Sequence, residues 1–93
     1  MSEEETVRHN LGSSRYEMET GGLAYAEYIV ERNRIVLTHT FVPPELRGRG
    51  IAEKLVRAAL DDARRQGRKV VPQCSYVAAF IERHPEFQAL VAD

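Results

Sequence analysis

Four residues, Arg47-Gly48-Arg49-Gly50, constrain this chain more than any other segment. The β-branched stretch before them stops at a double proline, and an amphipathic pattern begins with them. The N–H groups at the start of a helix have no partners within the helix and carry partial positive charge. Glycine lets an anion approach the backbone closely, and arginine adds a permanent, forked cation. We therefore expect a site for a phosphate-bearing ligand at this turn.

The composition is that of a small globular protein. A length of 93 residues suits one domain, residues 1–93, in which we expect residues 1–5 to be frayed. Hydrophobic residues make up 43% and charged residues 29% of the chain, which is ordinary for a globular domain. The net charge of −1 provides no basic field that would hold nucleic acid. Any anion site must therefore be local.

Several classes of protein are disfavoured by the same sequence. No apolar run approaches the roughly 20 residues that span a bilayer, and the acidic start, residues 1–5, is unlike a signal or transit peptide. A single cysteine, Cys74, cannot form an internal disulfide, which favours a reducing, cytoplasmic location. The histidines and acids show no metal-ligand spacing, so we expect neither a membrane partner nor a metal.

Alternating apolar residues predict strands in the first half of the chain. The predicted strands are Thr6–Leu11, with Val7, His9 and Leu11 on one face, then Arg15–Thr20, Leu23–Glu31 and Arg34–Val42. The predicted turns are Gly12–Ser14, Gly21-Gly22 and Arg32-Asn33, with Asn33 suited to the left-handed conformation. Such short turns predict an antiparallel four-strand meander.

The second half predicts a long helix, one more strand and shorter helices. The apolar stripe runs from about Gly48 to Gln66 and ends at Gly67. A short strand, Lys69–Pro72, follows, and then helices over Tyr76–Arg83 and Pro85–Ala92. A crossover helix makes the fifth strand parallel to the fourth. We thus predict an α/β (α+β) fold in which Arg47–Gly50 and Cys74 lie at the carboxyl ends of two parallel strands, where ligands bind.

These residues resemble the GNAT superfamily of N-acetyltransferases. Its acetyl-CoA-binding signature appears here as Arg47-x-x-Gly50-x-Ala52, between a β-branched strand and an amphipathic helix. Further stretches from His39 to Phe87 are similar to small single-domain GNAT-like proteins of the YjdJ type, and the likeness covers residues 6–91. These stretches are His39-Thr40, Pro43–Gly48, Val71-Pro72, Cys74 and Arg83–Phe87.

The resemblance implies an enzyme that transfers acetyl from acetyl-CoA to an amine. The backbone amides of residues 47–52 would hold the CoA pyrophosphate, and these residues are Arg47, Gly48, Arg49, Gly50, Ile51 and Ala52. Phe41 and Val42 would pair with the pantetheine arm as a strand edge does. The fourth and fifth strands would splay apart, with His39 and Cys74 facing the gap.

The chain also departs from the larger GNAT enzymes. Only Gly12–Ser14 joins its first two strands, where larger members have helices that help to form the acceptor site, and their C-terminal strands have no counterpart in it. The position of the tyrosine that many of them use as general acid aligns with Phe80, and Tyr76 lies one turn earlier. The resemblance therefore does not identify the acceptor, which could be a peptide, a protein lysine or a polyamine.

Two side chains are candidates for catalysis, each with a structural alternative. His39, with an ordinary pKa near 6.5, suits a general base, or it is a structural histidine on the face of Ile35, Leu37 and Phe41. Cys74 is a nucleophile that forms an acetyl-cysteine, a residue that lines the pocket, or a buried small hydrophobe. We expect the helix start after Cys74 to lower the pKa of its thiol.

Three functions therefore remain open at the level of sequence. The first is an acetyl-CoA-dependent N-acetyltransferase. The second is a non-catalytic CoA-binding or regulatory module, which the phenylalanine at position 80 favours. The third is a binder of another phosphate ligand, such as a nucleotide.

Overall fold

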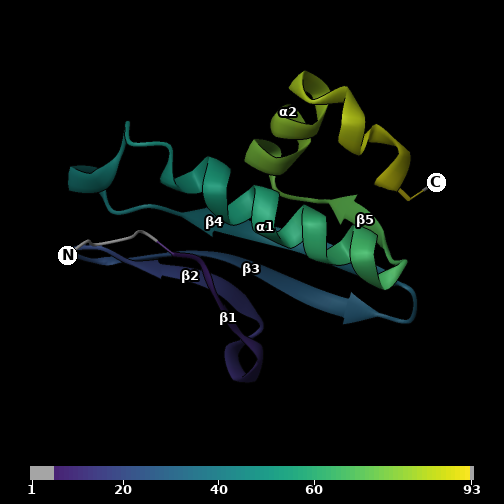
Figure 1. Cartoon of the computed structure of the whole chain (residues 1–93), viewed down its shortest axis with the longest axis horizontal. Coiled ribbons are helices and arrows are strands. Elements are labelled where there is room, and N and C mark those ends of the chain that lie inside the picture. Colours follow the sequence, from purple (N-terminus) through teal and green to yellow (C-terminus); the bar gives the residue numbers. More distant parts are fainter. Residues whose placement is uncertain (1–5, 93) are drawn as a thin grey trace.

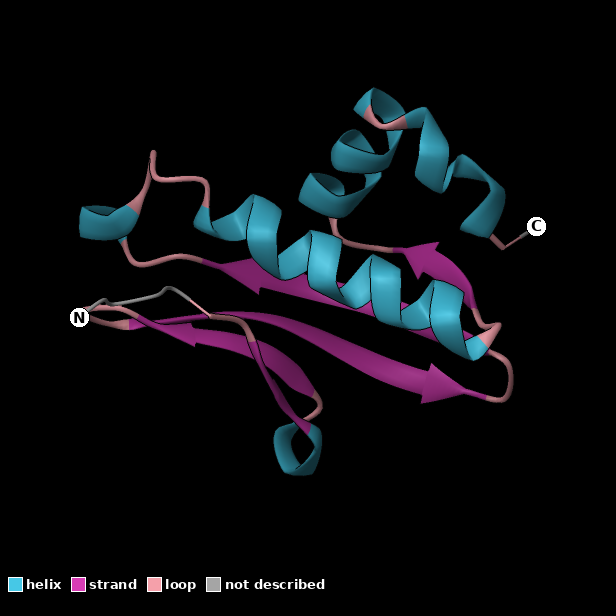
Figure 2. Cartoon of the chain, in the orientation of Figure 1, coloured by secondary structure: helices cyan, strands magenta, loops and turns pink. Residues whose placement is uncertain are grey.

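A computed structural model describes residues 6–92 and shows a five-stranded sheet with helices packed against it (Figures 1 and 2). The expected fraying of residues 1–5 lies outside the described residues. The elements in chain order are β1 (Arg8–Asn10), η1 (Leu11–Ser13), β2 (Arg15–Glu19), β3 (Leu23–Glu31), β4 (Arg34–Phe41), η2 (Pro44–Leu46), α1 (Ile51–Gln66), β5 (Lys69–Pro72), α2 (Ser75–Arg83) and η3 (Pro85–Leu90). The strand order is β1-β2-β3-β4-β5.

The predicted fold class is confirmed. Strands β1 to β4 pair antiparallel with their neighbours, and β5 pairs with β4 in parallel. The crossover between them is α1, which lies across the sheet, and α2 and η3 lie beside it over β5 (Figure 1). Within residues 6–92, no helix is both long and apolar enough to cross a membrane.

Some predicted boundaries were wrong for identifiable reasons. The long helix begins at Ile51 rather than Gly48, because Gly48 and Gly50 have φ angles of 86° and 76° and cannot belong to a right-handed helix. Leu11 leaves the first strand for the 3-10 turn η1 and is 74% exposed. In the β3–β4 turn, Arg32 rather than Asn33 takes the left-handed conformation, with φ 49°. The predicted third helix is the 3-10 helix η3.

A β-bulge in β4 changes which side chains face α1. Glu27 pairs with His39, and the next residue of β3, Tyr28, pairs with Leu37, so Thr38 is an extra residue with no partner of its own. Side chains alternate between faces along a strand, and the bulge shifts that alternation by one residue. His39 therefore lies on the face opposite Leu37. The prediction that a structural His39 would share a face with Ile35 and Leu37 was wrong.

The core lies between the sheet and the helices. Alternate residues of β2 and β3 point toward α1, whose apolar stripe covers them. Buried members of this cluster include Tyr16, Met18, Ala24, Ala26, Tyr28, Leu37, Leu55, Val56, Ala59, Leu60, Val70, Val77, Phe80 and Phe87. The intervening residues of β2 and β3 face the other side of the sheet, where neither α1 nor α2 covers them.

Candidate functional site

A groove opens where β4 and β5 separate. The two strands pair from Arg34 to Leu37 of β4, and the last backbone hydrogen bond is that of the Cys74 N–H donating to the Leu37 carbonyl at 2.9 Å. Beyond that point no strand among the described residues pairs with this edge of β4. The groove has a volume of about 490 Å³ and is lined by His39, Thr40, Phe41, Val42, Leu46, Arg47, Gly48, Gly50, Ile51, Ala52, Glu53 and Tyr76. The predicted splay of the strands is thus present.

The loop that forms one wall of the groove is held by the β2–β3 turn. Leu46 is 5% exposed and anchors the loop in the core. A Cβ atom added to Gly22 would lie 3.4 Å from Pro43 Cγ and 3.5 Å from Leu46 Cδ1, so the two loops are in contact there. The Arg47 Nε also donates to the Val42 carbonyl at 3.0 Å. These contacts fix where the chain turns into α1.

The start of α1 presents an array of free backbone donors. Gly50 is the N-cap and supplies no side-chain acceptor, and the first helical bond is made by the Lys54 N–H. Among residues 6–92 there is no acceptor for the N–H groups of Gly48, Arg49, Gly50, Ile51, Ala52 and Glu53. A Cβ atom added to Gly48 or Gly50 would meet no atom of residues 6–92 within 4 Å. The donors therefore border open space, as an anion site requires.

Most residues predicted for the cofactor do meet at this groove. Phe41 and Val42 come from the end of β4, and Arg47, Gly48, Gly50, Ile51 and Ala52 come from the turn and the first turn of α1. Arg49 contributes its backbone to the turn but does not line the groove. His39 lines it and Cys74 does not, so the structure does not bring these two residues together.

Comparison with known proteins agrees with this arrangement. Residues 15–90 match the sequence model of the GCN5-related N-acetyl-transferase family. This chain belongs to that family. Its structure is similar to that of a GCN5-like protein from Staphylococcus aureus determined by NMR in solution, with a TM-score of 0.75 and 25% sequence identity over 95% of this chain and 88% of the other.

The chain is also similar to Protein NATD1 of several vertebrates. The proteins from Homo sapiens and Bos taurus are each 39% identical to it over 59 residues, which are 63% of this chain and 51% of theirs. The protein from Danio rerio is 36% identical over 64 residues, or 69% of this chain and 57% of its own length. The chain thus spans about half the length of the curated relatives that it matches.

A tyrosine at the start of α2 also lines the groove. Tyr76 lines the groove, and its hydroxyl has no hydrogen-bond partner within residues 6–92. Burial, and then the nearby Glu53 carboxylate, raise the pKa of Tyr76 above its ordinary value, although Arg83 opposes them. The hydroxyl therefore stays protonated at neutral pH and can donate a hydrogen bond. Phe80, by contrast, is 1% exposed and belongs to the core.

The thiol of Cys74 sits at the start of α2, outside the groove. Its Sγ lies 3.6 Å from Thr40 Oγ1. Burial by itself raises the pKa of Cys74, but the N–H groups of Val77 and Tyr76 and the Thr40 hydroxyl lower it by more, so the net shift is downward. Those N–H groups face the sulfur without completing a capping hydrogen bond. The prediction that the start of the helix lowers the pKa of the Cys74 thiol is confirmed.

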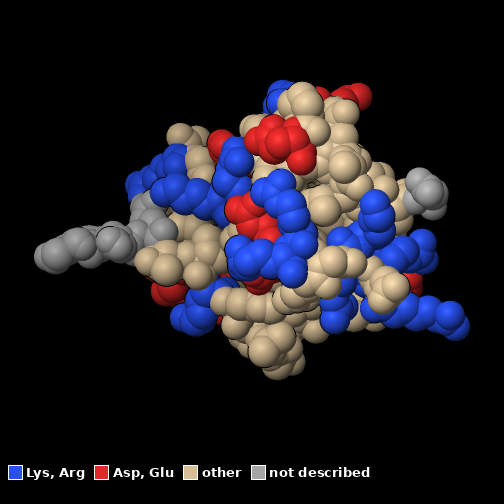
Figure 3. Space-filling view, turned by 45° about the vertical axis from the view of Figure 1, so that its right-hand side comes forward, with Lys and Arg blue, Asp and Glu red and all other residues tan. Residues whose placement is uncertain are grey.

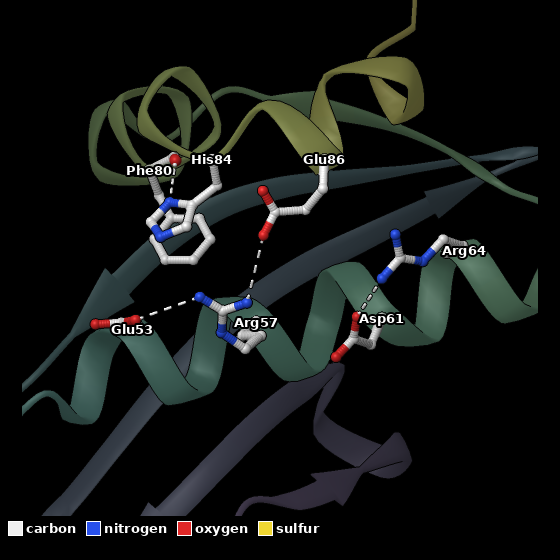
Figure 4. Close-up of polar contacts among 7 residues, drawn as sticks. All are labelled: Glu53, Arg57, Asp61, Arg64, Phe80, His84 and Glu86. Carbon is white, nitrogen blue, oxygen red and sulfur yellow. Dashed lines mark hydrogen bonds and ion pairs between the residues drawn. The ribbon is translucent and has the colours of Figure 1, made fainter.

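A polar network on α1 connects that helix with η3. Arg57 Nη2 donates to Glu53 Oε2 at 3.3 Å, and its Nη1 lies 3.8 Å from Glu86 Oε2 (Figure 4). Just after the end of α2, His84 stacks on Phe80 with ring centroids 3.9 Å apart (Figure 4). Acidic and basic side chains interleave over the face shown in Figure 3.

The sequence did not predict that Glu53, Leu46 and Thr40 line the groove, since nothing in their spacing distinguishes them from surface or core residues.

Proposed function

We propose that this chain is an acetyl-CoA-dependent N-acetyltransferase acting on an amine. The observation that carries the proposal is the run of unpaired N–H donors from Gly48 to Glu53, which borders a groove floored by apolar residues. Membership of the GCN5-related family supports the same reaction. A pyrophosphate fits such donors, because each N–H contributes a hydrogen bond to an anion and the helix dipole adds to them.

The rest of the groove fits the remainder of CoA. The edge of β4 at Phe41 and Val42 offers backbone groups that no strand pairs with in the described part of the chain, as an extended amide-bearing arm requires. Arg47 reaches the groove with a guanidinium that is held by the Val42 carbonyl, so a second cationic contact to phosphate is available. When bound, acetyl-CoA supplies an activated acetyl thioester.

The chain's own residues would then move protons around the acceptor. An alkylamine with a pKa of about 10.4 is almost fully protonated at pH 7, so a base must take its proton before it can attack. His39 is exposed beside the groove and is proposed as that base. Tyr76, kept protonated by its surroundings, is proposed to donate to the departing sulfur.

Cys74 offers an alternative route through an acetyl-cysteine. Its lowered pKa favours the nucleophilic thiolate, whereas its place against Thr40 outside the groove lining favours a supporting role. Mass spectrometry of the protein after mixing with acetyl-CoA separates the two. Transfer that is unharmed in Cys74→Ala, with no acetyl on the wild-type protein, would assign Cys74 to the supporting role.

Calorimetry with CoA, acetyl-CoA and ATP tests the cofactor. We expect CoA and acetyl-CoA to bind in the micromolar to low-millimolar range and ATP to bind more weakly. Arg47→Ala should weaken CoA binding by about 1.5–3 kcal/mol if the guanidinium meets a phosphate, and Arg49→Ala should do so less. Arg32→Ala, in the β3–β4 turn, is the matched control. Tighter binding of ATP than of CoA would instead favour a site for another phosphate ligand.

A non-catalytic CoA-binding module is the second candidate. The observation that favours it is Phe80, a residue without an acidic proton that is buried and stacked on His84. Release of free thiol from acetyl-CoA in the presence of a panel of amines distinguishes the two functions. Binding without thiol release would favour the module, and release that is lost in His39→Gln and Tyr76→Phe would favour the enzyme.

A further inference from the structure

The face of the sheet turned away from α1 carries an aromatic surface beside His39. Because cross-strand partners share a face, the pairs Tyr25–Phe41 and Glu27–His39 place all four side chains there. The Tyr25 ring lies 5.6 Å from that of Phe41 and 6.1 Å from that of His39, measured between centroids. This surface reaches the groove, since His39 and Phe41 line both.

One carboxylate on this face already holds a cation against an aromatic ring. Glu17 is 2% exposed, and its Oε2 lies 2.9 Å from Arg15 Nη2 while Arg8 Nη2 lies 2.7 Å from its Oε1. The Arg15 guanidinium lies over the Tyr25 ring, 4.6 Å from its centroid. A cation between a carboxylate and a π face is stabilised by both. Arg8 of β1 and Arg15 of β2 therefore both form ion pairs with Glu17 on this face.

Glu27 lies opposite Arg15, but its carboxylate has no ion pair of its own within residues 6–92, because Arg15 is paired with Glu17. The Glu27 side chain is half-buried and makes no ion pair or hydrogen bond with any residue from 6 to 92, and its backbone carbonyl accepts from Thr38 Oγ1. The neighbours on its face are Arg15, His39 and the ring of Tyr25. A carboxylate partly withdrawn from water and unpaired attracts a cation strongly.

We propose that Glu27 binds the ammonium group of the acceptor, and that the acceptor is a primary alkylammonium whose aliphatic part packs on Tyr25 and Phe41. This inference rests on the proposed acetyl transfer. The free edge of β4 beyond Leu37 connects this face with the groove, so an amine held by Glu27 lies next to His39. Glu27 is thus a residue of substrate binding and selectivity.

The test is an NMR titration with n-butylammonium at pH 7, with n-butanol as the uncharged probe of similar shape. The wild-type protein should show saturable shifts at Tyr25, Glu27, His39 and Phe41 with n-butylammonium, and much weaker ones with n-butanol. In Glu27→Gln the affinity for n-butylammonium should fall about tenfold or more. Glu27→Asp, which keeps the charge, should retain part of it. Glu19→Gln removes an exposed carboxylate from the same face and should leave the affinity unchanged.

Three results would overturn the inference: equal affinity in wild type and Glu27→Gln, equal binding of the alcohol and the ammonium, or shifts that lie away from these residues. Each variant's amide spectrum reports its folding, so loss of structure is not mistaken for loss of binding. The titration needs no catalysis. The proposed function fails separately, if calorimetry finds no CoA binding, and the two outcomes are therefore distinguishable.

Discussion

The two ends of α1 differ in how their backbone groups are satisfied. At the C-terminal end, Gly67 has φ 71° and its N–H donates to the carbonyls of Ala63 and Arg64, while the Arg68 N–H donates to the Ala63 carbonyl at 2.9 Å. At the N-terminal end, Gly50 has φ 76°, yet the N–H groups around it have no acceptor among the described residues. The same residue type in the same conformation closes one end and leaves the other open.

Side chains follow the same division. Near the closed end, Tyr16 donates to Asp62 Oδ2 at 2.8 Å, and His9 Nε2 and the Tyr28 hydroxyl are 2.6 Å apart. Arg65 also pairs with Asp62. Near the open end, the Tyr76 hydroxyl lines the groove and has no hydrogen-bond partner within residues 6–92. Satisfied groups stabilise a fold, whereas unsatisfied groups beside open space bind ligands, and this chain separates the two along one helix.

The largest effect on stability should come from the closed end. Tyr16 is 3% exposed, and Tyr16→Phe removes the hydroxyl that donates to Asp62. We expect the free energy of unfolding to fall by about 1–3 kcal/mol. Urea denaturation measures it. Tyr25→Phe is the control, because the Tyr25 hydroxyl has no hydrogen bond with residues 6–92, and its effect should be smaller. Equal effects would show that the closed end contributes no special stability.

A matched pair of glycine variants tests the two ends directly. Gly67→Ala and Gly50→Ala each place a Cβ atom in the left-handed conformation, which should cost about 1–2 kcal/mol of unfolding free energy. In Gly50→Ala the new methyl also enters the open space beside the free N–H groups. We therefore expect calorimetry to show weaker CoA binding for Gly50→Ala alone. Equal losses of CoA binding would contradict the division between the two ends.

The pH dependence of stability should also trace to the closed end, with a smaller effect. Partial burial lowers the pKa of His9 from its ordinary value of 6.5, so the unfolded chain binds this proton more readily than the folded one. The free energy of unfolding should then decline as the pH falls below 6.5 and level off below the folded pKa. Urea midpoints between pH 7 and 5 measure this. The decline should disappear in His9→Gln and persist in His39→Gln.

The smallest effect concerns the thiol of Cys74 near the open end. Its pKa lies below the ordinary value of 9.0 partly because the Thr40 hydroxyl hydrogen-bonds to the sulfur. Thr40→Val should raise that pKa and leave the stability almost unchanged. The pH dependence of alkylation by iodoacetamide reports it, with Thr20→Val as the control. An unchanged profile in Thr40→Val would assign the shift to the α2 backbone instead.

The sequence predicted what depends on local periodicity and turn residues. The bounds of β3 and β5 were correct to the residue, and Gly67 ended α1 as expected, because alternation and left-handed glycine have local signatures. The residues of the Arg47–Gly50 turn were found for the same reason. The predicted start of α1 was three residues too early, since the spacing of apolar residues does not show that Gly48 and Gly50 have positive φ angles.

What the sequence could not predict depends on pairing between distant residues. The β3–β4 turn lies at Arg32-Asn33 as predicted, between the paired residues Glu31 and Arg34, but Arg32 rather than Asn33 takes the left-handed conformation. The separation of His39 from Cys74 follows from the bulge at Thr38, for which the residue types around it give no signal. The free carboxylate of Glu27 became visible only once its neighbours on the sheet were known.

The bulge at Thr38 reverses which side chains of β4 point into the core. Before it, odd-numbered side chains such as Ile35 and Leu37 point into the core, and after it even-numbered ones such as Thr40 do so. A strand one residue shorter would turn His39 and Phe41 inward beneath α1 and send Thr40 outward. The number of residues in β4, and not only their identity, therefore decides on which side of the sheet an incoming molecule meets the imidazole.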